Sequence, residues 1–270
     1  MSRAPFRILH AGALRRPMGE CVQVFKECHP DLPVELESAG SRECAARVCD
    51  GGVYDVVALA DTAVFARWLV PDYVDCYFVF ATDQIVVAFD RFSRGSEEIT
   101  RDNWIDVLLS PGVIYGRSNH NLDPCGYRTL MVWQLAEKFY GRPGLYEALQ
   151  DGCSRIYPKS IDLAGALVEG RVDYAFLYSS VVRQLGLCQV NLPSRINLSN
   201  PALADYYAAA SVALEGRGPG EKVLLAGAPI EFAVAVPRNA RYPAEARWFV
   251  EFITGVEGQQ ILEACGLIPC

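Results

Sequence analysis

The 270-residue sequence lacks several features that would assign it to a common functional class. No apolar run reaches the ~18–20 residues that cross a bilayer, so no membrane-spanning helix is expected. Positive charge is not in excess: 25 Lys and Arg stand against 32 Asp and Glu. The formal net charge of −7 therefore disfavours nucleic acid or an anionic membrane as a partner. Internal repeats and low-complexity tracts are also missing, and a hydrophobic content of 51% suits an ordinary packed core.

Closely spaced cysteine motifs are missing too, although the sequence contains ten cysteines. None forms a C-x-x-C pair, so neither a zinc ribbon nor a thioredoxin-type motif is indicated. Most of the ten are expected to be small buried side chains. So many thiols are unusual for an oxidising compartment. Met1–Phe6 also has no apolar segment typical of a secretory signal peptide, which leaves a mature exported protein and a cytoplasmic protein as alternatives.

Strand-like and helix-like segments alternate along the chain, which predicts an α/β fold. Four junctions join an apolar strand to a helix through a short polar or small-residue turn, at Leu9–Leu14, Glu37–Ser41, Ser118–Arg128 and Asp173–Ser180. Small residues let a ligand approach the backbone, and the free N–H groups of a helix start favour an anion. Four such junctions in one chain suggest a shared anion site.

The junction Ser118–Arg128 is the most informative of the four. Asp123 stands where a helix N-cap belongs, and Pro124 stands at the first helical position. A plain capping role is the alternative to any ligand contact by Asp123. Elsewhere, Glu215–Gly220 is predicted to be a turn between two elements.

Several motifs, in this order, carry a resemblance to a known family. They are HAGAL (10–14), ESAGS (37–41), AD (60–61), SNHNLDPCGYR (118–128), DYAFLY (173–178), LPSRINL (192–198), PI (229–230) and EGQQIL (257–262). Together they resemble the archaeal-type tungstate/molybdate-binding proteins of ABC transporters, and DPCGYR is the most specific of them. The resemblance implies a solute-binding protein that works with a permease outside the cytoplasmic membrane, catalyses no reaction and needs no cofactor.

The resemblance also implies the type II periplasmic-binding-protein fold, in which two α/β lobes enclose the ligand in a cleft between them. The first lobe is expected to comprise residues 1–82 plus about 191–270, and the second residues 83–190. The return crossing is placed near Val190–Leu198 or at Ile230–Val236. A monomer is expected.

The ligand implied by the resemblance is a small tetrahedral oxyanion, most simply tungstate or molybdate. The residues expected to hold it are Gly12, Ala13, Ser41, Asp123, Pro124, Cys125, Gly126 and Tyr178, with Tyr127, Arg128, Leu177 and Arg195 as further candidates. In the family, an aspartate and a glutamate complete six-fold coordination of the metal atom of the anion. Asp123 matches that aspartate and is the expected metal ligand.

Because of two departures from the family pattern, the sequence does not decide which anion is bound or how it is coordinated. Leu177 replaces the family glutamate and cannot ligate a metal, and Ala13 replaces a serine. These changes favour a tetrahedral anion held by hydrogen bonds, or re-tuning to another anion; a cytoplasmic oxyanion sensor or storage protein is a further alternative. A Cys–His enzyme using Cys125 and His120 is conceivable, because thiol pKa values fall at helix N-termini, but no orienting third group is identifiable.

Overall fold

The computed structural model of the protein describes residues 4–216 and 220–270. The chain divides into two compact units, Met1–Thr82 with Glu231–Cys270 and Asp83–Ile230, each with its own sheet. The α/β prediction is therefore confirmed. Residues 1–3 of the N-terminal segment and residues 217–219 of the predicted turn lie outside the described residues.

The first unit has a six-stranded sheet and is built from two separate segments of the chain. Its elements are β1 (Phe6–Ala11), η1 (Gly12–Leu14), α1 (Arg15–Cys28), β2 (Val34–Ala39), α2 (Ser41–Cys49), β3 (Val56–Leu59), α3 (Thr62–Val64), η2 (Phe65–Leu69), β4 (Phe78–Thr82), β12 (Glu231–Ala235), α10 (Pro243–Thr254), α11 (Val256–Ala264) and β13 (Ile268–Pro269). The strand order is β13-β4-β12-β3-β1-β2.

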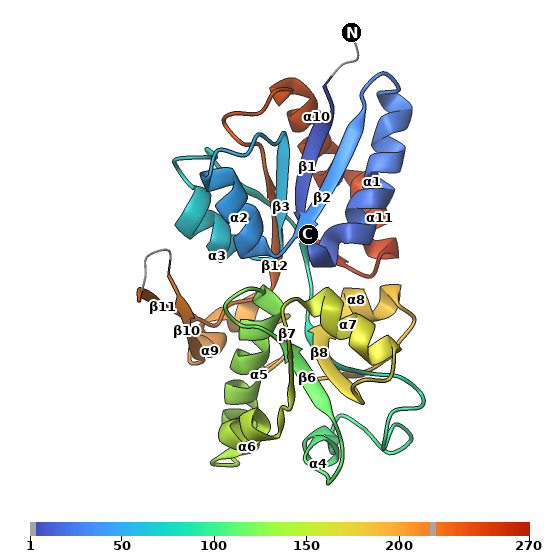
Figure 1. Cartoon of the computed structure of the whole chain (residues 1–270), viewed down its shortest axis with the longest axis vertical. Helices are drawn as coiled ribbons and strands as arrows, with labels where there is room; N and C mark the ends of the chain where they lie inside the picture. Colours follow the sequence, from blue (N-terminus) through green and yellow to red (C-terminus); the bar gives the residue numbers. More distant parts are fainter. Residues whose placement is uncertain (1–3, 217–219) are drawn as a thin grey trace. The chain divides into compact units, whose positions relative to one another are not determined.

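Strands β1, β2 and β3 are parallel and end at the same edge of this sheet. Ala11 pairs with Ala39, and His10 pairs with Ala58. Figure 1 shows α1 and α11 on one side of these strands and α2 and α3 on the other. Covering both faces explains why β1 and β3 read as nearly continuous apolar runs. The turns that follow the three strands therefore start from one edge.

The second unit is continuous in sequence. Its elements are β5 (Ile85–Phe89), α4 (Trp104–Leu108), β6 (Tyr115–Ser118), α5 (Pro124–Tyr140), α6 (Leu145–Gly152), β7 (Arg155–Tyr157), α7 (Ser160–Val168), β8 (Tyr174–Tyr178), α8 (Ser179–Gln184), β9 (Cys188–Asn191), η3 (Pro201–Leu203), α9 (Ala204–Tyr207), β10 (Ser211–Glu215) and β11 (Lys222–Ala226). Five strands form the sheet β7-β6-β8-β5-β9, and β10 pairs with β11 (Figure 1). Parallel strands β6 and β8 bring the junctions after Ser118 and Tyr178 to one edge.

The chain passes between the units at Thr82–Asp83 and again at Ile230–Glu231. The two passages run side by side, because Thr82 pairs with Glu231 in the first sheet and the Asp83 N–H donates to the Ile230 carbonyl at 3.4 Å. Residues 191–230 thus group with the second unit and not, as expected from the sequence, with the first; the return crossing is at the predicted alternative Ile230–Val236, not near Val190–Leu198. The segment stays there because β9 pairs with β5 and the Ile85 N–H donates to the Asn197 carbonyl.

The cysteines are less buried than the sequence predicted. Buried ones are Cys21, Cys44, Cys125 and Cys265, and the other six are partly or fully exposed. The expected buried majority was wrong, because several cysteines lie at element ends, such as Cys28 at the end of α1 and Cys270 at the C-terminus. Within residues 4–216 and 220–270, no helix combines the length and apolar character needed to cross a bilayer.

Candidate functional site

Asp123 caps two helices at once. Its carboxylate is only 6% exposed, and Oδ1 accepts the N–H of Cys125 at 3.2 Å, which caps α5 as predicted. Oδ2 accepts the N–H of Ser160, the first residue of α7. The positive ends of two helices therefore face one carboxylate. Each oxygen keeps a further lone pair, so capping and a ligand contact are compatible.

Burial dominates the electrostatics of this junction. It raises the pKa of Asp123, although hydrogen bonds from Ser160 and Cys125 act in the opposite direction. Burial, reinforced by the nearby Asp123, also raises the pKa of the Cys125 thiol well above its usual value. The prediction that the helix start lowers this pKa was wrong, because desolvation outweighs the helix dipole. Cys125 Sγ donates to the Phe176 carbonyl at 3.5 Å, as an inert buried thiol does.

Pro124 and Gly126 shape the same turn. Pro124 has no N–H, and the Gly126 N–H donates to the Asp123 carbonyl at 3.0 Å. A Cβ on residue 126 would collide with the Ser118 carbonyl oxygen, so only glycine fits. Between Pro124 and Gly126, every backbone N–H thus has a partner within the chain. Hydrogen bonds to an anion at this junction then depend mainly on side chains or on displacing Asp123.

Arg128 and Tyr178 form a buried pair beside this junction. Arg128 is 3% exposed, and its Nη1 donates to Tyr178 Oη at 2.7 Å. Burial raises the pKa of Tyr178 well above its usual value despite the guanidinium, so the phenol keeps its proton. A phenol that accepts from a cation is a stronger donor through its own O–H. The pair places positive charge at the carboxyl end of β8.

Leu177 lies on the other face of β8. It is fully buried and pairs with Val86. Its neighbours Phe176 and Tyr178 both contact α5, through the Trp133 ring at 5.3 Å and through Arg128. Because successive residues of a strand point to opposite faces, Leu177 points away from α5.

Ser118, at the carboxyl end of β6, is a candidate that the sequence alone does not single out. Its side chain is fully buried, and among the described residues its hydroxyl is one of two buried side-chain polar groups without a hydrogen-bond partner. Ser118 is near enough to lower the pKa of Asp123 and of Cys125, although its hydroxyl reaches neither with normal hydrogen-bond geometry. A buried hydroxyl without a partner is costly, and a ligand oxygen would satisfy it.

The first unit carries a second group of predicted residues at the carboxyl edge of β1, β2 and β3. Ser41 is 1% exposed, and its Oγ accepts the Ala60 N–H at 3.0 Å, which leaves the hydroxyl hydrogen to donate. Gly12 and Ala13 begin the 3-10 helix η1, and the first N–H groups of a helix have no partner inside it. Binding residues of α/β proteins commonly lie at this edge.

His10 is a buried residue at this edge, at the end of β1. Its Nδ1 lies 2.8 Å from the Ala11 carbonyl, and burial lowers its pKa, so the ring is neutral at pH 7. His10 therefore adds no positive charge for an anion.

The remaining candidates have other surroundings. Tyr127 is buried in α5, and its ring lies 6.0 Å from the Arg128 guanidinium. Arg195 is exposed, and its guanidinium stands over the Tyr206 ring at 5.7 Å. In the described part of the chain, no three His, Cys, Asp or Glu side chains are grouped to hold a metal ion.

Comparison with known proteins identifies the family. The family model described as bacterial extracellular solute-binding protein matches residues 6–268. The chain belongs to this family. The family consists of binding proteins, so the prediction that the chain is not an enzyme is confirmed.

Individual relatives support the predicted subgroup. A solute-binding protein of Petrotoga mobilis is 40% identical over 262 residues, covering 96% of this chain and 82% of its own. The molybdate/tungstate-binding protein WtpA of Pyrococcus abyssi is 33% identical over 284 aligned positions, covering 94% and 81%. The fold matches that of the Azotobacter vinelandii periplasmic molybdate-binding protein with a TM-score of 0.72, 16% identity and coverage of 98% and 99%. The resemblance to tungstate/molybdate-binding proteins and the two-lobed fold are thus confirmed.

Proposed function

We propose that this solute-binding protein captures a small tetrahedral oxyanion, tungstate or molybdate first, and presents it to an ABC permease. The buried Arg128–Tyr178 pair carries the proposal, because it directs a polarised phenol and positive charge to the end of β8 beside Asp123. The partnerless hydroxyl of Ser118 supports it. The relative WtpA, named for molybdate and tungstate, gives the choice of anion.

In the proposed site, hydrogen bonds and electrostatics hold the anion. Tyr178 and Ser118 donate from the second unit, and Ser41 with the amides of Gly12 and Ala13 donates from the first. Asp123 contacts the metal atom or accepts a proton from the anion, since an ionised carboxylate would otherwise repel it. That both groups of donors serve one anion is still a prediction.

Leu177 favours a second candidate, a binding protein for another oxyanion such as sulfate or phosphate. A site without the second carboxylate discriminates between anions by their size and hydrogen bonding, not by their ability to take extra ligands on the central atom. Tungstate then loses the advantage that six-fold coordination would give it.

A calorimetric comparison of tungstate, molybdate, sulfate and phosphate tests both candidates. We expect 1:1 binding and a rise in melting temperature with the preferred anion, because a ligand that binds only the folded state stabilises it. Tyr178→Phe and Ser41→Ala should each weaken binding at least about tenfold, a loss of ~1.4 kcal/mol. Ser194→Ala, at an exposed position, serves as the control. Absence of any shift with all four anions at millimolar concentration would refute oxyanion binding.

A further inference from the structure

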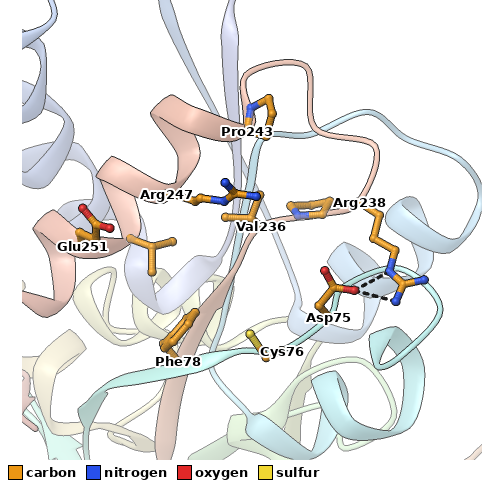
Figure 2. A pocket seen from close by; sticks show the side chains of 10 residues that line it. Asp75, Cys76, Phe78, Val236, Arg238, Pro243, Arg247 and Glu251 are labelled. Atoms are coloured by element: carbon orange, nitrogen blue, oxygen red, sulfur yellow. Dashed lines mark hydrogen bonds and ion pairs between the residues drawn. The ribbon is translucent and has the colours of Figure 1, made fainter.

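The first unit contains a cavity of about 530 Å³ that none of the predicted anion-site residues lines. It is bordered by Asp75, Cys76, Phe78, Val236, Pro237, Arg238, Pro243, Arg247, Val250 and Glu251 (Figure 2). Its volume lies within the range of about 300–1,000 Å³ typical of small-molecule sites. We propose that this cavity binds a short apolar peptide of two or three residues with free termini.

The floor of the cavity is apolar. Phe78 at the start of β4 is 49% exposed, and Val250 of α10 is buried. Val236 and the two prolines complete this surface, which therefore combines segments far apart in sequence. Apolar side chains of a ligand would gain free energy by covering the exposed ring of Phe78.

Two charges beside this floor lack partners. Arg247 and Glu251 are four residues apart on α10, a spacing that often gives an ion pair. Figure 2 instead shows the two side chains pointing away from one another. Among the described residues, neither side chain makes a hydrogen bond or an ion pair. A free cation and a free anion thus stand at separate places along the cavity.

The other charged pair does not alter this arrangement. Arg238 Nε and Nη2 both donate to Asp75 Oδ1, at 2.8 Å and 2.6 Å. The two side chains neutralise one another at one border of the cavity (Figure 2). The charges available to a ligand are therefore those of Arg247 and Glu251.

The separation of these two charges defines the ligand class. Four helical residues rise ~6 Å, and the diverging side chains add to that distance. The charges of a single amino acid are too close together to reach both. An extended chain spans ~3.3–3.6 Å per residue, so two residues cover the ~6 Å rise between the two positions and a third allows for the diverging side chains. A simple anion would face Glu251, and a simple cation would face Arg247. A peptide places its carboxylate at Arg247, its ammonium at Glu251 and its side chains on Phe78.

Cys76 supplies a local readout, because it is exposed and borders the cavity. The rate of its alkylation by iodoacetamide is followed by mass spectrometry in the full-length protein. The tripeptide Ala-Phe-Ala with free termini should slow this reaction in a saturable way at concentrations up to about 10 mM. Alkylation of Cys188, an exposed thiol of the second unit, should stay unchanged.

Matched peptides and variants separate the two charge contacts. N-acetylation or C-amidation of the tripeptide should each weaken protection at least about fivefold. Arg247→Gln should weaken the protection of Cys76 by the free peptide to the same extent, but should not change protection by the C-amidated peptide. Glu251→Gln should likewise weaken protection by the free peptide, but should not change protection by the N-acetylated peptide. Arg241→Gln, exposed in the same unit and outside the cavity lining, is the control.

Three outcomes would overturn the proposal: no protection of Cys76, equal protection by all the peptides, or full protection in Arg247→Gln. Triglycine should protect poorly, since it cannot cover Phe78. Tungstate affinity, measured in the same variants, should not change. Failure of the peptide site is therefore distinguishable from failure of the proposed oxyanion function.

Discussion

At the scale of single residues, Asp123 shows how one side chain can serve both folding and binding. Its carboxylate accepts N–H groups from Cys125 and from Ser160, so it joins the starts of α5 and α7. Asp123→Ala should lower the free energy of unfolding by about 2–4 kcal/mol, because it removes two charge-assisted bonds and leaves buried N–H groups unsatisfied. Urea unfolding measures this cost.

Asn200→Ala is the matched control for Asp123→Ala. Asn200 caps one short helix by accepting the Ala202 N–H at 3.0 Å, so its loss should cost about 1 kcal/mol. Equal costs for the two variants would mean that the bond to Ser160 contributes nothing. The proposed ligand contact requires more: tungstate affinity of Asp123→Ala should fall beyond what instability explains.

The burial of Asp83 leads us to expect that the stability of the protein depends on pH. It is 1% exposed and accepts hydrogen bonds from Ser180 Oγ and, at 2.7 Å, from the Gln84 N–H. Burial raises its pKa to about 6, so the folded state binds the proton more tightly than the unfolded state. This stabilisation is complete below about pH 4 and is lost as the pH rises through about 6. The stability of the natural protein relative to Asp83→Asn should therefore fall by roughly 3 kcal/mol over that range. A difference independent of pH in urea unfolding would contradict the prediction.

Leu177 offers a test of how the anion is bound. Leu177→Glu restores the carboxylate of the family pattern, but on the face of β8 that points away from α5. Tungstate binding should strengthen only if the anion is reached from that face, because tungsten can expand its coordination; unchanged affinity would place the anion on the α5 side. Sulfate cannot expand its coordination, so its affinity should fall in the first case, by tenfold for each ~1.4 kcal/mol of repulsion. Because position 177 is fully buried, unfolding of the variant must be measured in parallel. Six oxygen neighbours in the X-ray absorption spectrum of the natural protein with tungstate would contradict a tetrahedral site.

At the scale of elements, the junction between β6 and α5 depends on one glycine. Gly126→Ala places a Cβ against the Ser118 carbonyl and 2.7 Å from the Asn119 carbonyl carbon, so α5 must shift. We expect a loss of about 1–3 kcal/mol in thermal or urea unfolding. Gly165→Ala within α7 is the control, because its Cβ meets nothing within 4 Å and should stabilise the helix by about 0.5–1 kcal/mol. Similar effects of the two substitutions would argue against tight packing at the junction.

At the scale of the whole molecule, the chain path predicts two units that fold separately. Residues 83–230 form one continuous unit with its own sheet. The other unit is discontinuous, but Thr82 and Glu231 are paired neighbours on antiparallel strands. An Asn-Gly turn should therefore join residue 82 to residue 231, as in a two-residue hairpin. Both fragments should give α/β circular dichroism spectra and cooperative urea unfolding, whereas a fragment without a transition would show that its unit depends on the other.

The local features of this protein could be predicted from its sequence. Apolar runs and turn residues located the strand–helix junctions, and the Asp123–Pro124 pair placed the start of α5 correctly. These patterns act within a few residues, through capping, side-chain periodicity and backbone sterics. Ordered motifs then identified the family, which the relatives confirm.

Contacts between residues far apart in the chain could not be predicted in this way, because they depend on how the strands are ordered in the sheet. The bond from Ser160 to Asp123 spans 37 positions, and the Arg128–Tyr178 bond spans 50. The first depends on β7 lying beside β6 in the sheet, and the second on β8 lying beside β6; no local pattern specifies either neighbour. The burial that raises the pKa of Cys125 likewise comes from packing around α5, and it reversed the expectation from the helix start alone. Desolvation depends on the assembled core, so it could not be inferred from neighbouring residues.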